Sequence, residues 1–205
     1  VLGKYLAMMI YGLALIGILS IYVIFSACTI KAFDGIAVLS GLLGLYLLIC
    51  SYAAIGLFMS SLTSYQVVSA MGTLAILAAL SLVRGVWQDI ELVRDITYWL
   101  SINGRADEFV NGLICSEDVI YFVIVTALFL VLTIIRLQVI RQKTSWVIAW
   151  GKYIGVFLIA MFLGYLSSRP QLMGFYDATR TKARTLTPNS QEVMNKMDGD
   201  LKITT

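Results

Sequence analysis

The sequence predicts an all-α polytopic membrane protein with five transmembrane helices. Two short re-entrant or interfacial helices are expected before the fourth, and the start of an extracytoplasmic α/β domain after the fifth. Hydrophobic residues make up 60% and charged residues 13% of the 205-residue chain, whereas soluble domains have about 25% charged residues. Apolar runs also recur at the length of about 20 residues that crosses the hydrocarbon of a bilayer. Composition and run length together predict this class.

The five expected spans follow directly from these apolar runs. They cover residues 6–25, 36–59, 67–83, 119–135 and 146–166. Trp146 and Trp150 open the last span, and tryptophan is enriched at the boundary between lipid and water. Because the chain starts at Val1 and ends within a polar pattern, we expect it to be a piece of a longer protein.

Basic residues after the fourth span set the expected orientation. Arg136, Arg141 and Lys143 follow that span with no acidic residue among them, which by the positive-inside rule places them in the cytoplasm. Counting back, the start of the chain at Lys4 is also cytoplasmic. Residues 84–118 then lie outside; they contain three basic and seven acidic residues, a net charge of −4. The tail from Phe175 is expected outside as well.

The outer segment contains two amphipathic patterns. Apolar residues between 86 and 100 fall near one side of a predicted short helix. Asn103–Gly104 is expected to end this helix. A second pattern, spaced i, i+3, i+4, i+7 and i+8, comprises Ala106, Phe109, Val110, Leu113 and Ile114. Ser116 suits the N-cap of the next span, with two acidic residues in its first turn. The two short helices either lie on the outer leaflet or dip into the membrane, and the pattern favours neither.

The spans exclude several classes of function. Residues 5–30, 35–83 and 119–135 contain no Asp, Glu, Lys or Arg, whereas ion-coupled transporters usually carry ionisable groups in mid-membrane. The chain has no histidine, which removes His-based triads and most catalytic zinc sites. Its basic residues are dispersed apart from Arg180, Lys182 and Arg184, which gives no support for nucleic-acid binding. We therefore expect no catalytic, cofactor-binding or metal-binding residue in this chain. We also expect that the chain is not an enzyme.

The three cysteines do not define a disulfide framework. Cys50 lies inside an apolar run and is expected to be a packed thiol. Cys28 and Cys115 fall in loops on the same expected side of the membrane. A disulfide between them is geometrically allowed, although no framework spacing supports it.

Three runs of the sequence resemble a known family. They are "VLGKYLAMMIYGLAL", "AAIGLFMSSLTSYQVVSAMGTLAIL" and "YWLSINGRADEFVNGLICSEDVIYFVIVTALFLVLT". In order and spacing they resemble the second half of an ABC-2 type permease, and most nearly the gliding-motility-associated permeases of Bacteroidetes-type bacteria. The features shared with that family are Gly3–Lys4, Ser61–Leu62–Thr63, Gly112–Leu113–Ile114, Asp118 and Tyr121–Phe122.

The resemblance implies a domain organisation. Residues 1–140 would form the last four helices of the permease, with the outer segment as a pair of re-entrant helices. Residues 141–174 would be a linker and a fifth transmembrane helix. Residues 175–205 would start an extracytoplasmic domain. The protein would lie in the bacterial inner membrane.

The resemblance also implies partners. These are an ABC ATPase dimer that binds ATP and Mg²⁺, a second permease copy or a related permease, and membrane lipid. This chain lacks a P-loop motif, so no cofactor is expected on it. The residues expected to face the ATPase are Lys4, Ser61, Thr63, Arg136, Arg141 and Lys143. Those expected in the outer re-entrant hairpin are Trp87, Trp99, Phe109, Gly112 and Asp118.

The tail from Phe175 resembles the start of the extracytoplasmic component of the same gliding-associated system. The matching residues are Asp177, Thr179, Lys182 and Thr185–Leu186–Thr187. Thr187 also suits an N-cap followed by Pro188 at the first helical position, and "LKIT" alternates like a strand. The alternative is a generic polar tail. A domain that starts here would offer a surface for a periplasmic partner.

Two functions are therefore expected. The first is the permease subunit of an ATP-driven exporter whose path is largely apolar. The alternative is a non-transporting membrane scaffold, or a subunit that transmits mechanical force from an ATPase.

Overall fold

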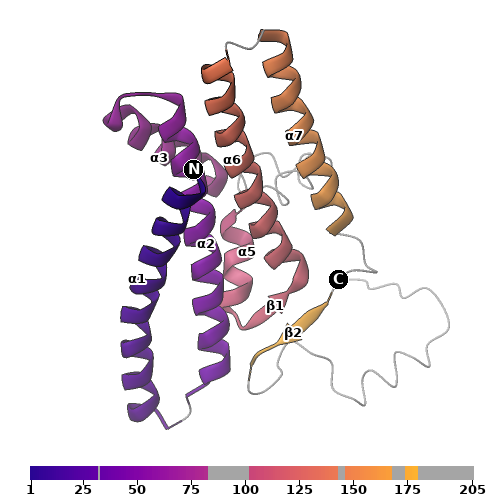
Figure 1. The fold of residues 1–205 in the computed structure, drawn as a ribbon. Coiled ribbons are helices and arrows are strands. Elements are labelled where there is room, and N and C mark those ends of the chain that lie inside the picture. Colours follow the sequence, from indigo (N-terminus) through magenta and orange to yellow (C-terminus); the bar gives the residue numbers. More distant parts are fainter. Residues whose placement is uncertain (32, 83–101, 143–145, 168–173, 180–205) are drawn as a thin grey trace, which may run out of the picture.

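The computed structural model describes residues 1–31, 33–82, 102–142, 146–167 and 174–179 (Figure 1). Helices account for most of these residues. In chain order the elements are α1 (Leu2–Thr29), α2 (Gly35–Leu62), α3 (Gln66–Leu82), α5 (Ile102–Val110), β1 (Leu113–Cys115), α6 (Ser116–Gln142), α7 (Trp146–Ser167) and β2 (Phe175–Asp177).

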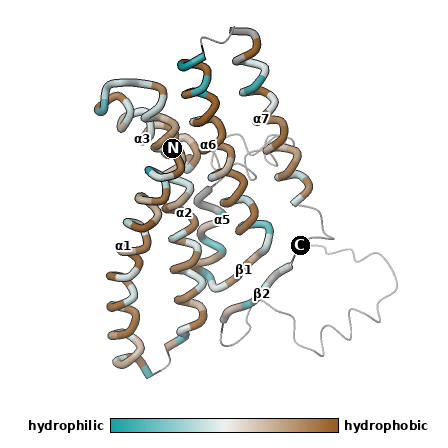
Figure 2. Tube along the Cα trace, viewed as in Figure 1, coloured by the Kyte–Doolittle hydropathy of each residue, from teal (hydrophilic) through white to brown (hydrophobic). Residues whose placement is uncertain are grey.

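Four of the described helices, α1, α2, α6 and α7, are long and apolar enough to cross a membrane. Figure 2 shows hydrophobic residues along most of their length. The third expected span, over residues 67–83, coincides with α3, which has 17 residues over the described part of the chain.

The long helices alternate in direction (Figure 1). The start of α1, the end of α2 and the end of α6 lie at one end of the molecule, which we call the Lys4 end. The end of α1 and the start of α2 lie at the opposite end, which we call the Asp34 end. This alternation is the one that the predicted topology requires.

Local hydrogen bonds define where α2 begins and ends. The Asp34 carboxylate accepts from the Ala37 backbone N–H at 3.4 Å, as an N-cap does. At the other end, the Thr63 hydroxyl accepts from the Tyr65 N–H at 3.2 Å and stabilises the turn into α3.

Helix α2 is the centre of the packing, since α1, α3, α5 and α6 all contact it. Its buried positions include the small residues Ser40, Gly44, Ser51 and Ala54. Small side chains let neighbouring helices approach closely, which stabilises helix pairs where the hydrophobic effect is weak. The Ser51 hydroxyl also lies 3.3 Å from that of Thr126 on α6.

The second amphipathic pattern is only partly helical. Helix α5 ends at Val110, and Gly112 has a φ of +81° that L side chains rarely adopt. The backbone turns there, so Leu113 and Ile114 lie in strand β1 instead of the predicted helix. Asn103–Gly104, predicted to end the first short helix, lies within α5. The first short helix itself, expected over 86–100, lies outside the described residues.

Strand β2 of the tail pairs antiparallel with β1, an arrangement that the sequence did not predict. The register places Leu113 opposite Asp177 and Cys115 opposite Phe175. The helix and strand predicted after residue 187 lie outside the described residues. Cys28 and Cys115 are free thiols, so the allowed disulfide is not formed. Cys50 is buried, as predicted.

Candidate functional site

Helix α5 lies alongside the body of α2. The Ser40 hydroxyl donates to the Phe109 carbonyl at 2.9 Å, and the Phe109 side chain packs directly against Gly44. Gly44 is nine residues into α2, about 14 Å along its axis. Helix α5 runs toward the Asp34 end and turns through β1 into α6 (Figure 1). Helix α5 therefore lies between α2 and α6 and not beyond their ends.

Gly44 leaves the space that Phe109 fills, because a Cβ at position 44 would overlap the Phe109 side chain. We expect Gly44→Ala to lower the free energy of unfolding by about 1–3 kcal/mol, the usual cost of overpacking. Thermal unfolding of the purified protein in detergent measures this. The matched control is Gly17→Ala on α1, where no heavy atom lies within 4 Å of the Cβ position. Equal melting temperatures for the two variants would contradict the packing described.

A buried ion pair fixes α5 to the start of α6. Arg105 Nη1 donates to Asp118 Oδ1 at 2.7 Å, and Nη2 donates to Glu117 Oε1 at 2.8 Å. The guanidinium carbon lies 4.6 Å from the centre of the Tyr121 ring, within cation–π range. Arg105 is 3% exposed and Asp118 5%. The first turn of a helix also favours carboxylates, because its backbone N–H groups are unpaired.

The buried charges of Arg105, Glu117 and Asp118 stabilise one another. Burial lowers the pKa of Arg105, but hydrogen bonds and charge attraction from Glu117 and Asp118 outweigh burial and raise it above its usual value. The guanidinium is therefore cationic. An isolated charge in apolar surroundings costs several kcal/mol, whereas a well hydrogen-bonded pair offsets most of that cost. The ion pairs of Arg105 with Glu117 and Asp118 thus hold α5 against the first turn of α6.

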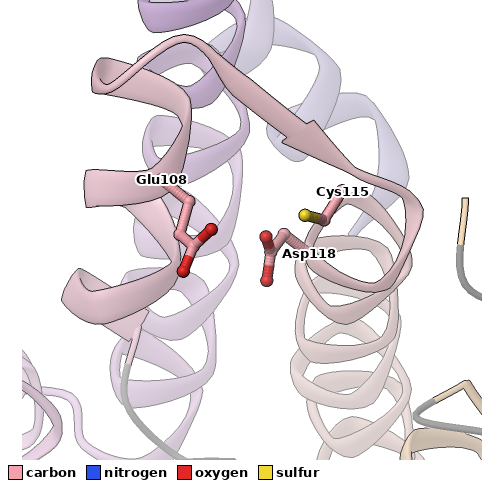
Figure 3. Close-up of side chains that lie close together, drawn as sticks. All are labelled: Glu108, Cys115 and Asp118. Carbon is pink, nitrogen blue, oxygen red and sulfur yellow. The ribbon is translucent and has the colours of Figure 1, made fainter. Parts of the chain in front are cut away.

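Three potential metal ligands converge at the same corner (Figure 3). Ligand atoms of Glu108, Cys115 and Asp118 lie within 4.8 Å of one another. However, Asp118 Oδ1 already accepts from Arg105. Burial, then the nearby carboxylates, raise the pKa of the Cys115 thiol to about 11. Since a thiol must lose its proton to bind a metal, this cluster suits a cation poorly and we assign no metal to it.

A second feature is an apolar groove of about 600 Å³ formed by α2, α6 and α7. It lies toward the Lys4 end, because its lining residues come from the last two turns of α2, the second half of α6 and the part of α7 up to Leu158. Its walls include Phe58, Leu62, Leu132, Arg136, Tyr153 and Phe157.

The structure describes most of the residues expected to face an ATPase. Lys4 is exposed in the first turn of α1, and Arg141 is exposed at the end of α6. Ser61 and Thr63 lie at the turn between α2 and α3. All four are at the Lys4 end. Arg136 instead lines the groove, and Lys143 lies outside the described residues.

The structure brings together three of the residues expected in the outer hairpin. Phe109 on α5, Gly112 in the turn and Asp118 on α6 all lie at the corner where α5 meets α6. The Gly112 carbonyl accepts from the Ala178 N–H at 2.8 Å, which links the tail to this corner. Trp87 and Trp99 lie outside the described residues.

Sequence reasoning missed Arg105, although a signal was present. Arg105 is the only basic residue between positions 96 and 135, and the same stretch contains four acidic residues. A lone cation among carboxylates at the border of an apolar run indicates a buried ion pair, because only a paired charge is buried without a large cost.

The length and apolar character of the four long helices define a multi-pass membrane protein. No family model matches the chain, and no curated protein or solved structure shows significant similarity to it.

Proposed function

We propose that the chain is a permease subunit of an ATP-driven ABC-2 type exporter in the bacterial inner membrane, powered by separate ATPase subunits. The observation that carries this proposal is the placement of α5 between α2 and α6. A short helix that runs beside the spans and turns into the last permease helix fits the returning limb of a re-entrant hairpin. Its residues lie within the third run that resembles the permease family.

The grouping of Lys4, Ser61, Thr63 and Arg141 at one end supports the proposal as well. These residues come from three segments that are far apart in sequence. All four are polar or basic, and in the proposed assembly a cytoplasmic ATPase acts at this end of the chain. Because α2 contacts α1, α3, α5 and α6, a displacement at the Lys4 end would reach the corner formed by α5 and α6.

The absence of charged residues from three long segments of the spans favours an external source of energy. Residues 5–30, 35–83 and 119–135 contain no ionisable Asp, Glu, Lys or Arg, so these segments provide no relay for protons and no ion site. In the proposed assembly a second permease copy, or a related permease, encloses an apolar path with this one. The tail, held to the corner by pairing of β2 with β1, leads into a domain that meets a periplasmic partner.

Cysteine crosslinking tests which end meets an ATPase. In a background with Cys28→Ser, Cys50→Ala and Cys115→Ser, we would introduce Ser61→Cys or, as a control, Lys31→Cys at the Asp34 end. Native membranes would be treated with a short crosslinker and the products identified by mass spectrometry. We expect a P-loop ATPase linked to position 61 and none linked to position 31. An ATPase linked at position 31, or at neither position, would contradict the proposal.

A further inference from the structure

The groove formed by α2, α6 and α7 contains two buried donor atoms that have no hydrogen bond within the described part of the chain. Arg136 Nε is buried without a hydrogen bond, and so is the hydroxyl oxygen of Tyr153 on α7. Both residues line the groove. A buried donor without an acceptor costs about 1–3 kcal/mol, and more when it is charged. Two such donors in one groove, with no acceptor for either among the described residues, suit a ligand that carries an acceptor.

The charges around the groove favour an anion as the acceptor. No Asp or Glu occurs between positions 118 and 177, so α6 beyond its first turn and all of α7 offer no carboxylate. The hairpin of α6 and α7 instead carries Arg136, Arg141 and Lys152. A phosphate accepts two parallel hydrogen bonds from one guanidinium and a further one from a phenol.

The rest of the groove is suited to hydrocarbon. Apart from Arg136 and Tyr153, the lining consists of aliphatic and aromatic residues. Leu132 lies one turn from Arg136 toward the Asp34 end, and Phe157 lies one turn from Tyr153 in the same direction along α7. The volume of about 600 Å³ falls in the usual range for ligand sites of about 300–1,000 Å³.

We propose that this groove binds one anionic phospholipid from the leaflet at the Lys4 end. Its phosphate accepts from Arg136 and Tyr153, and an acyl chain lies along Leu132, Phe157 and Phe58. Basic pockets between transmembrane helices are known to bind anionic lipid headgroups. The inference requires only that the chain lies in a membrane, and it holds whether or not the chain transports a cargo.

Quenching of Trp150 fluorescence tests the proposal, because Trp150 also lines the groove. Trp87, Trp99 and Trp146 would be replaced by Phe, which leaves Trp150 as the only tryptophan. The full chain would be placed in two sets of bilayers that contain phosphatidylglycerol and phosphatidylcholine at equal mole fractions. In one set the phosphatidylglycerol has brominated acyl chains, and in the other the phosphatidylcholine has them. A brominated chain quenches tryptophan only on close contact.

We expect phosphatidylglycerol to be preferred about fivefold over phosphatidylcholine at Trp150, the effect of about 1 kcal/mol from one basic residue. Arg136→Gln should abolish this preference, and Tyr153→Phe should reduce it. Arg141→Gln is the matched control: this arginine is exposed on the same helix, so its loss should leave the preference intact.

Three outcomes would overturn the proposal. Equal quenching by the two lipids would mean that the groove holds acyl chains without selecting a headgroup. A preference lost equally in Arg141→Gln and Arg136→Gln would indicate diffuse attraction to the surface. Quenching by neither lipid would mean that protein covers the groove. Gel filtration of each variant shows whether it is folded, and Tyr153→Phe provides a second test if Arg136→Gln is not.

Discussion

Arg105→Gln is expected to lower the free energy of unfolding by about 3–5 kcal/mol, the effect of removing one partner from a buried ion pair. The substitution leaves the carboxylates of Asp118 and Glu117 at the corner without the cation they contact at 2.7 and 2.8 Å. Thermal unfolding in detergent measures the loss. Alkylation of Cys115, after Cys28→Ser and Cys50→Ala, reports whether the corner opens.

Two further variants separate the ion pair from a general effect of charge. Lys31→Gln removes an exposed cation at the Asp34 end and should leave the melting temperature unchanged. Adding Glu117→Gln and Asp118→Asn to Arg105→Gln removes the uncompensated charges, so the triple variant should recover much of the lost stability. If Arg105→Gln melts like the unmodified protein, the network does not hold α5 to α6.

Phe109→Ala is the second substitution with a large expected effect. Phe109 is 0% exposed, its ring centre lies 6.2 Å from that of Phe122, and it fills the space beside Gly44. In soluble proteins such truncations cost about 3–5 kcal/mol. We expect about 3 kcal/mol here, because in apolar surroundings the cavity and lost contacts remain while the transfer from water contributes less. Thermal unfolding in detergent again measures the loss.

The neighbouring residue is the control for Phe109. Val110 is on the same helix but 70% exposed, so Val110→Ala should change stability by less than about 0.5 kcal/mol. The double variant Gly44→Ala with Phe109→Ala should be less destabilised than the sum of the two single variants, because the new Cβ partly fills the cavity. Simple addition of the two effects would show that Gly44 and Phe109 are not in contact.

The long helices were predictable because hydropathy over about 20 residues is a strong signal. Helices α1, α2, α6 and α7 coincide with expected spans, and each observed helix extends beyond or matches its apolar run. The third expected span, over residues 67–83, is a helix of 17 described residues.

The corner between α5 and α6 was less predictable, because it depends on contacts that no periodicity encodes. The spacing of Ala106, Phe109 and Val110 correctly indicates a helix, but the positive φ of Gly112 ends it. Leu113 and Ile114 then pair with the tail, a partner about 60 residues away in sequence. Arg105 was missed for a related reason, since the burial of a charge depends on which carboxylates the fold brings to it.

The most direct test of the proposed permease is purification of the full-length protein from its native membrane in a gentle detergent, followed by identification and counting of the subunits that remain bound. We predict one P-loop ATPase subunit for each permease copy, at a total of two of each. A preparation that repeatedly lacks any ATPase, including after milder extraction, would contradict the proposal and favour a membrane scaffold that does not transport.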